Sequence, residues 1–351
     1  MEIKQLLSQA IQKRASDLHL VTGIHPTLRI DGTLFSLTEH PILDGVLIEG
    51  LIKDVTNDEQ REILTVNREL DFSVGFGDQA RFRVNAYYQK SSLAASFRWI
   101  PTEIPSVDSL GLPPICHQLA QLRQGLILFT GPTGHGKSTS MASIIAEILN
   151  NRGVHVVTIE DPVEFTFIHS KGIVSQREMH GDTHSWAVAL RSVLREDPDV
   201  VLVGEMRDYE TISATLTIAE TGHLVFATLH TNSAAQSVDR IVDVFPEQQQ
   251  AQVRMQLSGT LEAIISQRLM PQISGRRTLA YEIMLGTTAI KTVVREGKTH
   301  LIDNIIQTSS EAGMAPLEVS LAQLIRDGKI TYETGREFAI RPDELTRLVN
   351  R

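Results

Sequence analysis

The sequence predicts an α/β protein with two domains, an N-terminal α+β domain and a larger domain built on a mainly parallel sheet. The chain has 351 residues, and two domains are the default at roughly 100–200 residues per domain. Before residue 100, strand patterns flank turn residues, which indicates antiparallel hairpins. After residue 115, short apolar runs alternate with amphipathic helical segments, which is typical of a parallel sheet covered by helices.

The composition excludes several classes of protein. Hydrophobic residues make up 42% and charged residues 21%, so the chain is globular and long enough to bury a core. It carries 33 basic and 42 acidic residues, and the resulting net charge of −9 disfavours non-specific binding to nucleic acid or anionic membranes. The single cysteine, Cys116, excludes an internal disulfide and a cysteine-based zinc site, which favours the reducing cytoplasm.

Neither a membrane span nor a signal peptide is expected. No run of about 18 apolar residues occurs, and the start of the chain is charged throughout and lacks an apolar signal core. Apolar residues of this segment follow helical spacing and predict an amphipathic helix: Ile3, Leu6, Leu7, Ala10 and Ile11. We expect this helix to pack on its own domain, and binding to a membrane surface is the alternative.

The rest of the N-terminal domain is predicted as antiparallel strands and one polar helical stretch at 43–66. The strands are expected at 18–21, 28–30, 34–35, 70–74, 80–88 and 93–100. Asp31-Gly32 and residues 75–78 supply two hairpin turns, because glycine adopts the positive φ that tight turns need.

Prolines and a glycine mark 101–114 as a linker between domains 1–100 and 115–351. In the second domain, continuous apolar runs predict strands buried on both faces, at 126–129, 154–159, 200–203 and 224–229. Helices are expected at 138–150, 186–194 and 208–222, the last with Asp208 as its N-cap. A long helix is predicted after Pro246 with one apolar face: Val253, Leu257, Leu261, Ile264 and Ile265. The final segment, 286–351, is predicted to be polar and helical.

A phosphate-binding loop follows the first strand of the second domain. Residues 131–138, GPTGHGKS, match G-x-x-x-x-G-K-[ST] between a predicted strand and a predicted helix, which is the context the motif requires. The glycines let backbone N–H groups wrap phosphates, Lys137 contacts the β- and γ-phosphates, and Ser138 binds Mg²⁺. We expect His135 to be exposed and uninvolved, and an effect on the ionisation of the loop is the alternative. The predicted nucleotide-binding residues are Gly131, Pro132, Thr133, Gly134, His135, Gly136, Lys137, Ser138 and Thr139.

Acidic side chains follow two of the predicted strands at their carboxyl ends, where ligands of parallel sheets bind. Glu160, Asp161 and Glu164 follow the second strand, and Glu205 follows the third. Gly204 occupies the position at which a Walker B strand usually has an aspartate, and a metal held through water tolerates the longer Glu205. Hydrolysis also needs a group that orients or deprotonates water, and spacing alone does not assign this role between Glu164 and Glu205. The alternative is that these acidic residues only cap helices or lie at solvated loop ends.

Two histidines bracket the strand at 224–229, so they lie roughly 20 Å apart if that strand is straight. Only His230 is then at the nucleotide end of the sheet, where it is predicted to sense the γ-phosphate or to be a hydrogen-bonded structural residue. His223 is predicted to be structural or interfacial.

Three arginines alternate with apolar residues in the N-terminal strands and point away from the packed face: Arg81, Arg83 and Arg98. They are either solvated charges or groups that reach a neighbouring subunit's phosphates, where an arginine is worth about 10³–10⁵ in rate.

Seven motifs together resemble one protein family. They are ASDLHL (15–20), RFRVNAYYQ (81–89), GPTGHGKS (131–138), TIEDPVEF (158–165), LREDPDVVLVGEMRD (194–208), ETGHLVFATLHTN (220–232) and AIKTVVREGK (289–298). The set is similar to the PilT-like type IV pilus retraction ATPases of the secretion ATPase superfamily, and the resemblance covers nearly the whole chain.

The resemblance implies a PAS-like N-terminal domain and a RecA-like ATPase domain, in a ring-shaped homo-hexamer with ATP and Mg²⁺ between the two domains. It implies that Glu164 is the general base, that Glu205 lies near the metal, and that His230 belongs to a histidine box. Arg83 and Arg98 match arginines that meet nucleotide in this family. The sequence departs from the family in the loop, where His135 replaces the commonest serine, and in the last motif: Lys291, Thr292 and Val293.

The implied function is a cytoplasmic motor, peripheral at the inner face of the cytoplasmic membrane, that hydrolyses ATP to retract type IV pili and drive twitching motility. The implied partners are the pilus platform protein of the inner membrane and a paralogous pilus ATPase, whereas nucleic acid and membrane insertion are not expected. The alternatives are a pilus extension or type II secretion ATPase, a non-hydrolysing accessory subunit of the same ring, and a RecA-like nucleic-acid motor. Extension ATPases commonly carry a four-cysteine zinc module, which the single cysteine disfavours.

Overall fold

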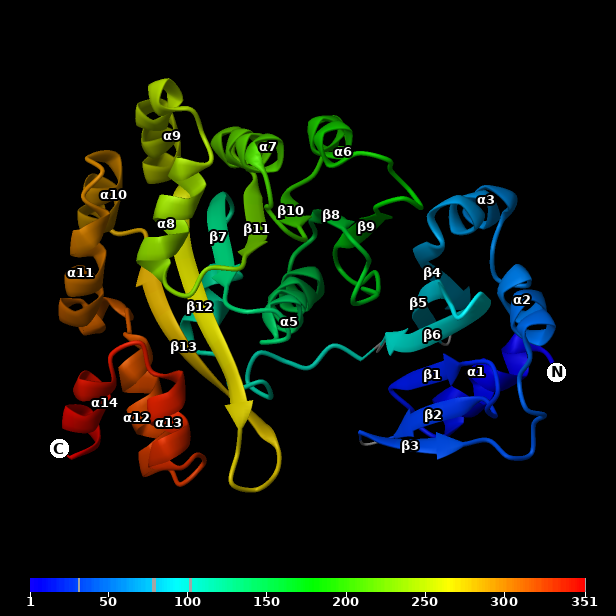
Figure 1. The fold of residues 1–351 in the computed structure, drawn as a ribbon. Coiled ribbons are helices and arrows are strands. Elements are labelled where there is room, and N and C mark those ends of the chain that lie inside the picture. The colour runs from blue at the N-terminus through cyan, green and yellow to red at the C-terminus, as the bar shows by residue number, and fades with distance from the viewer. Residues whose placement is uncertain (31, 78–79, 101–102, 351) are drawn as a thin grey trace. The chain divides into compact units, whose positions relative to one another are not determined.

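The computed structural model describes residues 1–30, 32–77, 80–100 and 103–350. The chain divides into two compact units (Figure 1): Met1–Glu103 with Pro162–Thr166, and Ile104–Asp161 with Phe167–Arg351. The division between Glu103 and Ile104 falls inside the predicted linker, whose first two residues lie outside the described ranges. One unit contains an antiparallel sheet and the other a mainly parallel sheet, which confirms the predicted α/β fold class.

A six-stranded antiparallel sheet forms the first unit, in the order β3-β2-β1-β6-β5-β4. Its strands are β1 (Asp17–Leu20), β2 (Thr27–Ile30), β3 (Thr33–Ser36), β4 (Glu69–Phe76), β5 (Ala80–Gln89) and β6 (Ser92–Ile100). Each corresponds to a predicted strand. The predicted turn residues Asp31 and Asp78 lie outside the described residues, whereas Gly32 has the positive φ, 83°, that the turn prediction requires.

Three helices accompany this sheet: α1 (Ile3–Gln12), α2 (Gly45–Lys53) and α3 (Asp58–Asn67). The apolar face of α1 is buried in the core of its own unit, with Leu6 fully buried, so the prediction that this helix packs on its own domain is confirmed. The single helical stretch predicted over 43–66 is two helices, because the Asn57 side chain accepts the backbone N–H of Gln60 and caps a new helix there.

A seven-stranded sheet forms the second unit, in the order β13-β12-β7-β11-β10-β8-β9. Neighbouring strands are parallel except for the antiparallel pair β12 and β13. The strands are β7 (Gly125–Thr130), β8 (His155–Glu160), β9 (Ile173–Glu178), β10 (Val200–Val203), β11 (Leu224–Leu229), β12 (Leu261–Pro271) and β13 (Arg277–Leu285). The four predicted strands are confirmed, and β9, β12 and β13 extend the sheet beyond them.

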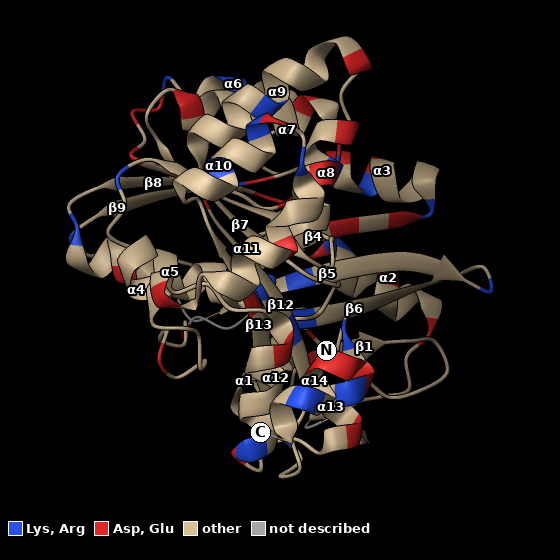
Figure 2. Cartoon of the chain, turned by 90° about the vertical axis from the view of Figure 1, so that its left-hand side faces the viewer, with Lys and Arg blue, Asp and Glu red and all other residues tan. Residues whose placement is uncertain are grey.

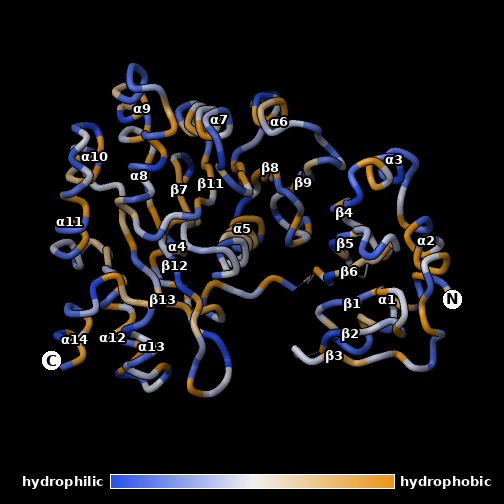
Figure 3. Tube along the Cα trace, viewed as in Figure 1, coloured by the Kyte–Doolittle hydropathy of each residue, from blue (hydrophilic) through white to orange (hydrophobic). Residues whose placement is uncertain are grey.

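Helices cover both faces of this sheet. They are α4 (Ile115–Leu119), α5 (Lys137–Asn151), α6 (Trp186–Val193), α7 (Tyr209–Glu220), α8 (Ala234–Asp243), α9 (Glu247–Thr260), α10 (Thr288–Arg295) and α11 (Ile302–Thr308). Helices α6 to α11 share one core with alternate strand residues, whereas α5 contacts β7 and β11 and lies outside that core, on the opposite face. In Figure 3 the tubes of α6 and α7 carry both the hydrophobic (orange) and the hydrophilic (blue) colour, as expected for amphipathic helices.

The cap predicted for α7 is present. The Asp208 carboxylate accepts the backbone N–H and the hydroxyl of Thr211, each at 2.8 Å. These hydrogen bonds hold the pKa of Asp208 below its ordinary value. Helix α7 therefore starts where the sequence predicts, after the short segment that follows the carboxyl end of β10.

The helix predicted after Pro246 is wrong in its second half. Helix α9 ends at Thr260, and Leu261, Ile264 and Ile265 lie in strand β12. All three side chains are fully buried, and a strand covered on both faces has the same continuous apolar pattern as a buried helix. The segment forms a strand because it pairs with β7 on one side and with β13 on the other.

The end of the chain is helical, as predicted. Beyond α11, the chain forms α12 (Leu317–Arg326), α13 (Tyr332–Phe338) and α14 (Pro342–Val349), which we call the C-terminal helices. They share a small core with the last part of β12 and with β13, through Met270 and Ala280. The C-terminal helices therefore pack on the same part of β12 that adjoins the phosphate loop.

Candidate active site

The phosphate loop joins β7 to α5 and is seated against β12. Gly131 has a φ of 137°, and a Cβ at this position would lie 2.4 Å from the carbonyl oxygen of Gln267, so glycine is required there. Gly136 is the N-cap of α5 and has a φ of 80°. Helix α5 therefore begins at Lys137, and its N-terminal turn lies at the end of the loop, an arrangement that binds phosphate.

Lys137 is only 7% exposed, and its ammonium group is held inside the loop. Nζ donates to the carbonyl oxygen of Gly131 at 2.8 Å and to that of Pro132 at 3.1 Å. It also lies 3.4 Å from Nδ1 of His230. These contacts orient the cation before any ligand is bound, which reduces the ordering cost of binding an anion.

His230 connects the phosphate loop to Glu205. Its Nε2 lies 3.1 Å from Oε1 of Glu205, and its Nδ1 lies 3.3 Å from the hydroxyl of Thr133. This pattern assigns the ring proton to Nε2, which donates to the carboxylate, while Nδ1 accepts. Arg207 Nε donates to Oε2 of Glu205 at 2.8 Å, and this hydrogen bond raises the pKa of Arg207 above its ordinary value. Both oxygens of Glu205 are therefore oriented at the carboxyl end of β10.

The two histidines lie at opposite ends of β11, as their spacing predicts. Leu229 pairs with Thr130, so His230 lies beside the start of the phosphate loop. His223 Nδ1 lies instead 3.1 Å from the carbonyl oxygen of Ile218 at the end of α7. The predicted position of His230 is confirmed, and its role as a γ-phosphate sensor stays a prediction.

The acidic residues that follow β8 separate into different environments. Glu160 is buried and accepts the hydroxyl of Thr158 at 2.6 Å, which is a structural contact. Asp161 is exposed. Glu164 is also exposed, between the buried Val163 and Phe165, and it lies in the segment that clusters with the first unit. Its role as general base stays a prediction.

Arg83 and Arg98 are paired directly across β5 and β6. Phe82 and Phe97, their neighbours in sequence, are fully buried, so the prediction that these arginines point away from the packed face is confirmed. Two like charges directly opposite each other repel, and Arg98 Nε lies 2.9 Å from Oδ1 of Asp17. Asp17 Oδ2 also lies 3.9 Å from Arg29 Nε, so this one carboxylate lies beside the guanidinium groups of Arg98 and Arg29 and does not neutralise both.

Residues of β12 complete the site, although the sequence predicts a helix there. Ser266 accepts a hydrogen bond from the last residue of β7 at 2.8 Å, and Gln267 Nε2 donates to the carbonyl oxygen of His135 at 2.7 Å. Arg268 donates through Nη2 to the backbone and side-chain oxygens of Asn232 at 3.0 and 3.1 Å. Strand β12 therefore holds both the phosphate loop and the segment after His230. The sequence signal that could have identified β12 is its apolar run followed by polar residues, because the other strands of this sheet show the same pattern.

The expectation for His135 is wrong, because this side chain is half-buried and hydrogen-bonded. Its Nδ1 accepts the backbone N–H of Leu269 at 3.1 Å. Its ring centroid lies 6.4 Å from that of Phe338, with the two rings tilted by 46°. The side chain folds back onto β12 because the loop runs along the edge of that strand, which the sequence does not reveal.

The residues predicted to hold Mg²⁺ fit this ion. Ser138 lies in the first turn of α5, directly after Lys137, and Glu205 is joined to Lys137 through His230. Across the described part of the chain, no three His, Cys, Asp or Glu side chains are grouped so as to hold a metal by themselves. Mg²⁺ usually takes one or two protein ligands and completes its shell with phosphates and water. The donor set therefore suits an ion that binds together with a nucleotide.

Glu282 on β13 positions the segment after His230. Its carboxyl group is buried, and Oε1 accepts the backbone N–H of Ala234 at 2.7 Å, at the start of α8. Burial raises the pKa of Glu282 to about 7, against the opposing effect of the hydrogen bond from Ala234. The group therefore holds a proton in the folded protein at pH values where a solvated glutamate is ionised.

We expect Glu282→Gln to stabilise the fold more at pH 8 than at pH 5. Glutamine keeps an acceptor for the Ala234 N–H group but cannot ionise. In the wild type, the unfolded chain loses the proton near pH 4.5 and the folded chain near pH 7. The raised pKa therefore lowers wild-type stability across this window, by roughly 3 kcal/mol. Urea unfolding at both pH values measures the gain, and a gain that is equal at pH 5 and pH 8 would contradict the buried, protonated carboxyl group.

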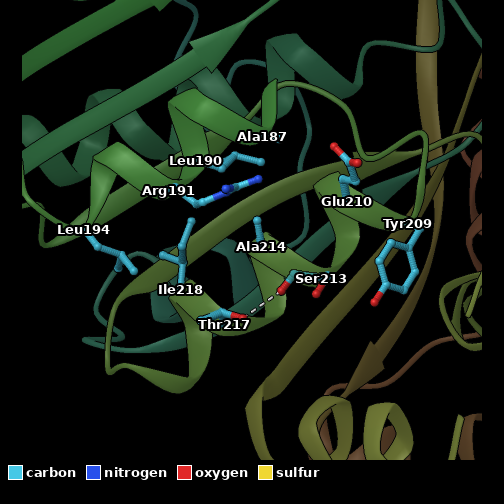
Figure 4. Close-up of a pocket in the computed structure, with 10 residues that line it drawn as sticks. All are labelled: Ala187, Leu190, Arg191, Leu194, Tyr209, Glu210, Ser213, Ala214, Thr217 and Ile218. Carbon is cyan, nitrogen blue, oxygen red and sulfur yellow. Dashed lines mark hydrogen bonds between the residues drawn. The ribbon is translucent and has the colours of Figure 1, made fainter. Parts of the chain in front are cut away.

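A cavity of about 370 Å³ lies between α6 and α7 (Figure 4). Leu190 and Ile218 give it apolar walls, Arg191 and Glu210 are its charged lining residues, and Thr217 donates to the carbonyl oxygen of Ser213 at 2.9 Å. None of the residues predicted to bind nucleotide lines it. Phosphate recognition needs N–H groups converging at a loop, and the phosphate loop is therefore the candidate nucleotide site.

Charges of both signs are distributed over the two units. In the view of Figure 2, Lys and Arg residues (blue) are interspersed with Asp and Glu residues (red) along the helices and strands. None of the helices in the described ranges combines the length and the hydropathy needed to cross a bilayer.

Known proteins resemble this chain over nearly its whole length. The family model for type II/IV secretion system proteins matches residues 1–339. The type IV pilus retraction ATPase PilT of Pseudomonas aeruginosa is 46% identical over 343 residues, which cover 98% of this chain and 99% of that protein. A twitching motility protein of Neisseria gonorrhoeae is 44% identical over 315 residues, 90% of this chain and 84% of that protein. The crystal structure of the pilus retraction motor PilT with bound ADP has a TM-score of 0.92 and 46% identity, over 99% of both chains.

Proposed function

This chain belongs to the type II/IV secretion system protein family as a PilT-like member, and we propose that it is a hexameric ATPase that powers type IV pilus retraction. The observation that carries the proposal is the arrangement at the phosphate loop, in which His230 connects Lys137 to Glu205. A cation for the phosphates and a carboxylate for metal and water are the groups that phosphoryl transfer to water requires. The ADP-bound structure of the relative that is 46% identical supports nucleotide binding here.

Binding of ATP uses the phosphate loop and the start of α5. The proposed contacts run from Gly131 to Thr139: backbone N–H groups surround the phosphates, and Lys137 contacts the β- and γ-phosphates. Ser138 and Glu205 are the residues that would hold Mg²⁺, which supplies neutralisation of the phosphate charge. The loop is already braced by β12, so little rearrangement is needed on binding.

Glu164 is the proposed general base. Both oxygens of Glu205 are engaged, one by His230 and the other by Arg207, which suits a carboxylate with a fixed place near the metal. A base has to take up a proton during the reaction, and the exposed Glu164 is the remaining candidate carboxylate. His230 contacts Lys137 and Glu205 together, so it is proposed to sense whether a γ-phosphate is present.

Arg83 and Arg98 are proposed to act on the nucleotide of a neighbouring subunit in a homo-hexamer. Their positive charges are paired on the unpacked face of the first sheet, where a partner's phosphates would relieve the repulsion. An arginine supplied in trans is worth about 10³–10⁵ in rate. The domains 1–100 and 115–351 are proposed to open and close about the linker 101–114, which would convert hydrolysis into movement.

The proposed load is the pilus platform protein of the inner membrane. The protein would contact it from the cytoplasm, as a peripheral protein at the inner face of the membrane, and a paralogous pilus ATPase is a further proposed partner. Disassembly of the pilus fibre would then drive twitching motility. The support for this step comes from two relatives at 46% and 44% identity, a type IV pilus retraction ATPase and a twitching motility protein.

Deleting the gene and imaging the cells tests the direction of the force. We expect excess pili that do not retract, and loss of twitching, because assembly continues without disassembly. Complementation with the wild-type gene should restore retraction, and complementation with Lys137→Ala should not, because retraction needs ATP hydrolysis by this chain. Restored retraction with Lys137→Ala would instead indicate an accessory subunit that does not hydrolyse ATP. Cells without pili would contradict retraction and would indicate an extension ATPase.

A further inference from the structure

We propose that His135 is a positioning residue that ties the phosphate loop to the C-terminal helices, so that these helices set how tightly the loop holds nucleotide phosphates. The inference rests on the proposed nucleotide site. In this inference, nucleotide affinity depends on a side chain of the loop and not only on its backbone. It also depends on the C-terminal helices, which have no part in the proposed hydrolysis steps.

The loop takes the place of a strand along one edge of β12. Strand β7 pairs with β12 only as far as Ser266, whereas β13 pairs with β12 to its end. Beyond Ser266, His135 provides the acceptors for β12: its carbonyl oxygen accepts from Gln267 Nε2 at 2.7 Å, and its Nδ1 accepts from the Leu269 N–H group at 3.1 Å. A backbone N–H group at a strand edge needs such a partner. The loop is therefore fastened to β12 by the side chain of one of its own residues.

The imidazole is suited to this contact at neutral pH. An acceptor Nδ1 carries no proton, so the ring is neutral with its proton on Nε2. Burial holds the pKa of His135 below its ordinary value, and nearby positive charges act in the same direction: Arg268 on β12, Lys137 on α5 and Arg277 on β13. A neutral ring also avoids placing a second positive charge next to the Lys137 ammonium group inside the loop.

The other side of the imidazole meets the C-terminal helices. Phe338 is the last residue of α13, and its ring centroid lies 6.4 Å from that of His135, within the range of aromatic pairs. Phe338 packs on the core that the C-terminal helices share with β12 and β13, and α13 contacts β12 directly. A shift of α13 therefore changes the packing of His135, which is hydrogen-bonded to the strand that supports the loop.

A small residue at position 135 would break both connections. A serine side chain, for example, is too short to contact Phe338 or to supply the acceptor where Nδ1 lies. The Leu269 N–H group would then lose this acceptor. The connection is consequently a property of this chain's own loop, separate from the glycines and the lysine that the loop shares with other phosphate loops.

Calorimetric titration of the full-length protein with Mg·ADP tests the connection through its hydrogen bond. We expect His135→Ala to weaken ADP binding by about tenfold, because the loop loses an anchor and a backbone N–H group loses its acceptor. His135→Asn places a carbonyl oxygen near the position of Nδ1, so we expect it to recover part of that loss. Equal weakening in both variants would show that the hydrogen bond from Leu269 to His135 does not contribute to ADP affinity.

A double-mutant cycle tests the connection to the C-terminal helices. Phe338→Leu keeps the apolar volume and removes the ring, and we expect it to weaken Mg·ADP binding about threefold in the wild type but not in the His135→Ala background. The same factor in both backgrounds would overturn the inference, because the helices would then not act through His135. Hydrogen exchange of the peptide that contains Leu269 should rise in His135→Ala and recover in His135→Asn.

The outcomes separate this inference from the proposed function. If the wild type does not bind Mg·ADP, the nucleotide site itself is wrong. If the wild type binds Mg·ADP and His135→Ala binds it equally well, only the positioning role is wrong. A lower unfolding midpoint with unchanged ADP affinity would likewise overturn the inference, since it would show a contribution to stability alone.

Discussion

Replacing Lys137 by alanine abolishes ATP turnover, with kcat reduced by at least about 10²–10³-fold, the cost of removing a preorganised group that stabilises transition-state charge. The ammonium group of Lys137 is held in the loop by two carbonyl oxygens and lies next to His230. Alanine removes the charge that meets the β- and γ-phosphates, and it also removes the contact between the Lys137 ammonium group and His230. Phosphate release by the purified protein measures the effect.

The matched control for this prediction is Lys329→Ala. Lys329 is exposed in the turn between two C-terminal helices, so the same substitution removes a charge outside the phosphate loop. We expect this variant to hydrolyse ATP as the wild type does. Wild-type turnover in Lys137→Ala would overturn the assignment of the phosphate loop as the site of hydrolysis.

Replacing Glu164 by glutamine separates binding from hydrolysis. We expect Glu164→Gln to bind Mg·ATP with little change in affinity and to hydrolyse it about 10²–10⁴-fold more slowly, the usual contribution of a general base. Glutamine preserves the size of the exposed side chain and one acceptor oxygen, but it cannot take a proton from water. Titration with ATP and a single-turnover assay give the two quantities independently.

Glu210→Gln is the control for this second variant. Glu210 is an exposed carboxylate of α7 that lines the cavity between α6 and α7, and it has no predicted part in hydrolysis. Its neutralisation should leave turnover unchanged. Loss of ATP binding in Glu164→Gln would assign that residue a structural role and would return the function of general base to Glu205.

Several features of the site follow from local sequence. The glycines of the phosphate loop, the buried strands β7, β8, β10 and β11, and the cap at Asp208 are recognisable because each depends on a few adjacent residues. The placement of His230 at the nucleotide end of β11 follows from strand geometry alone. The alternation along β5 predicts in the same way that Arg83 faces away from the core.

Strand β12 shows where this reasoning fails. Its first residues continue the apolar spacing of α9, so the sequence predicts one long helix through Ile265. The strand forms because its edge residues find partners more than a hundred positions away, among them Thr130 and His135. Hydrophobic periodicity records which faces are buried but not what buries them, and here both faces are buried.

The amino-acid sequence by itself determined that this chain carries a phosphate loop between a buried strand and a helix, with candidate carboxylates at neighbouring strand ends. Only the tertiary structure decided which groups meet that loop: the Gln267 side chain and the Leu269 backbone N–H group against His135, and the Phe338 ring on its far side. The physical reason is that hydrogen bonds and ring contacts are made between segments that the sheet brings together, and strand pairing is a property of the whole chain.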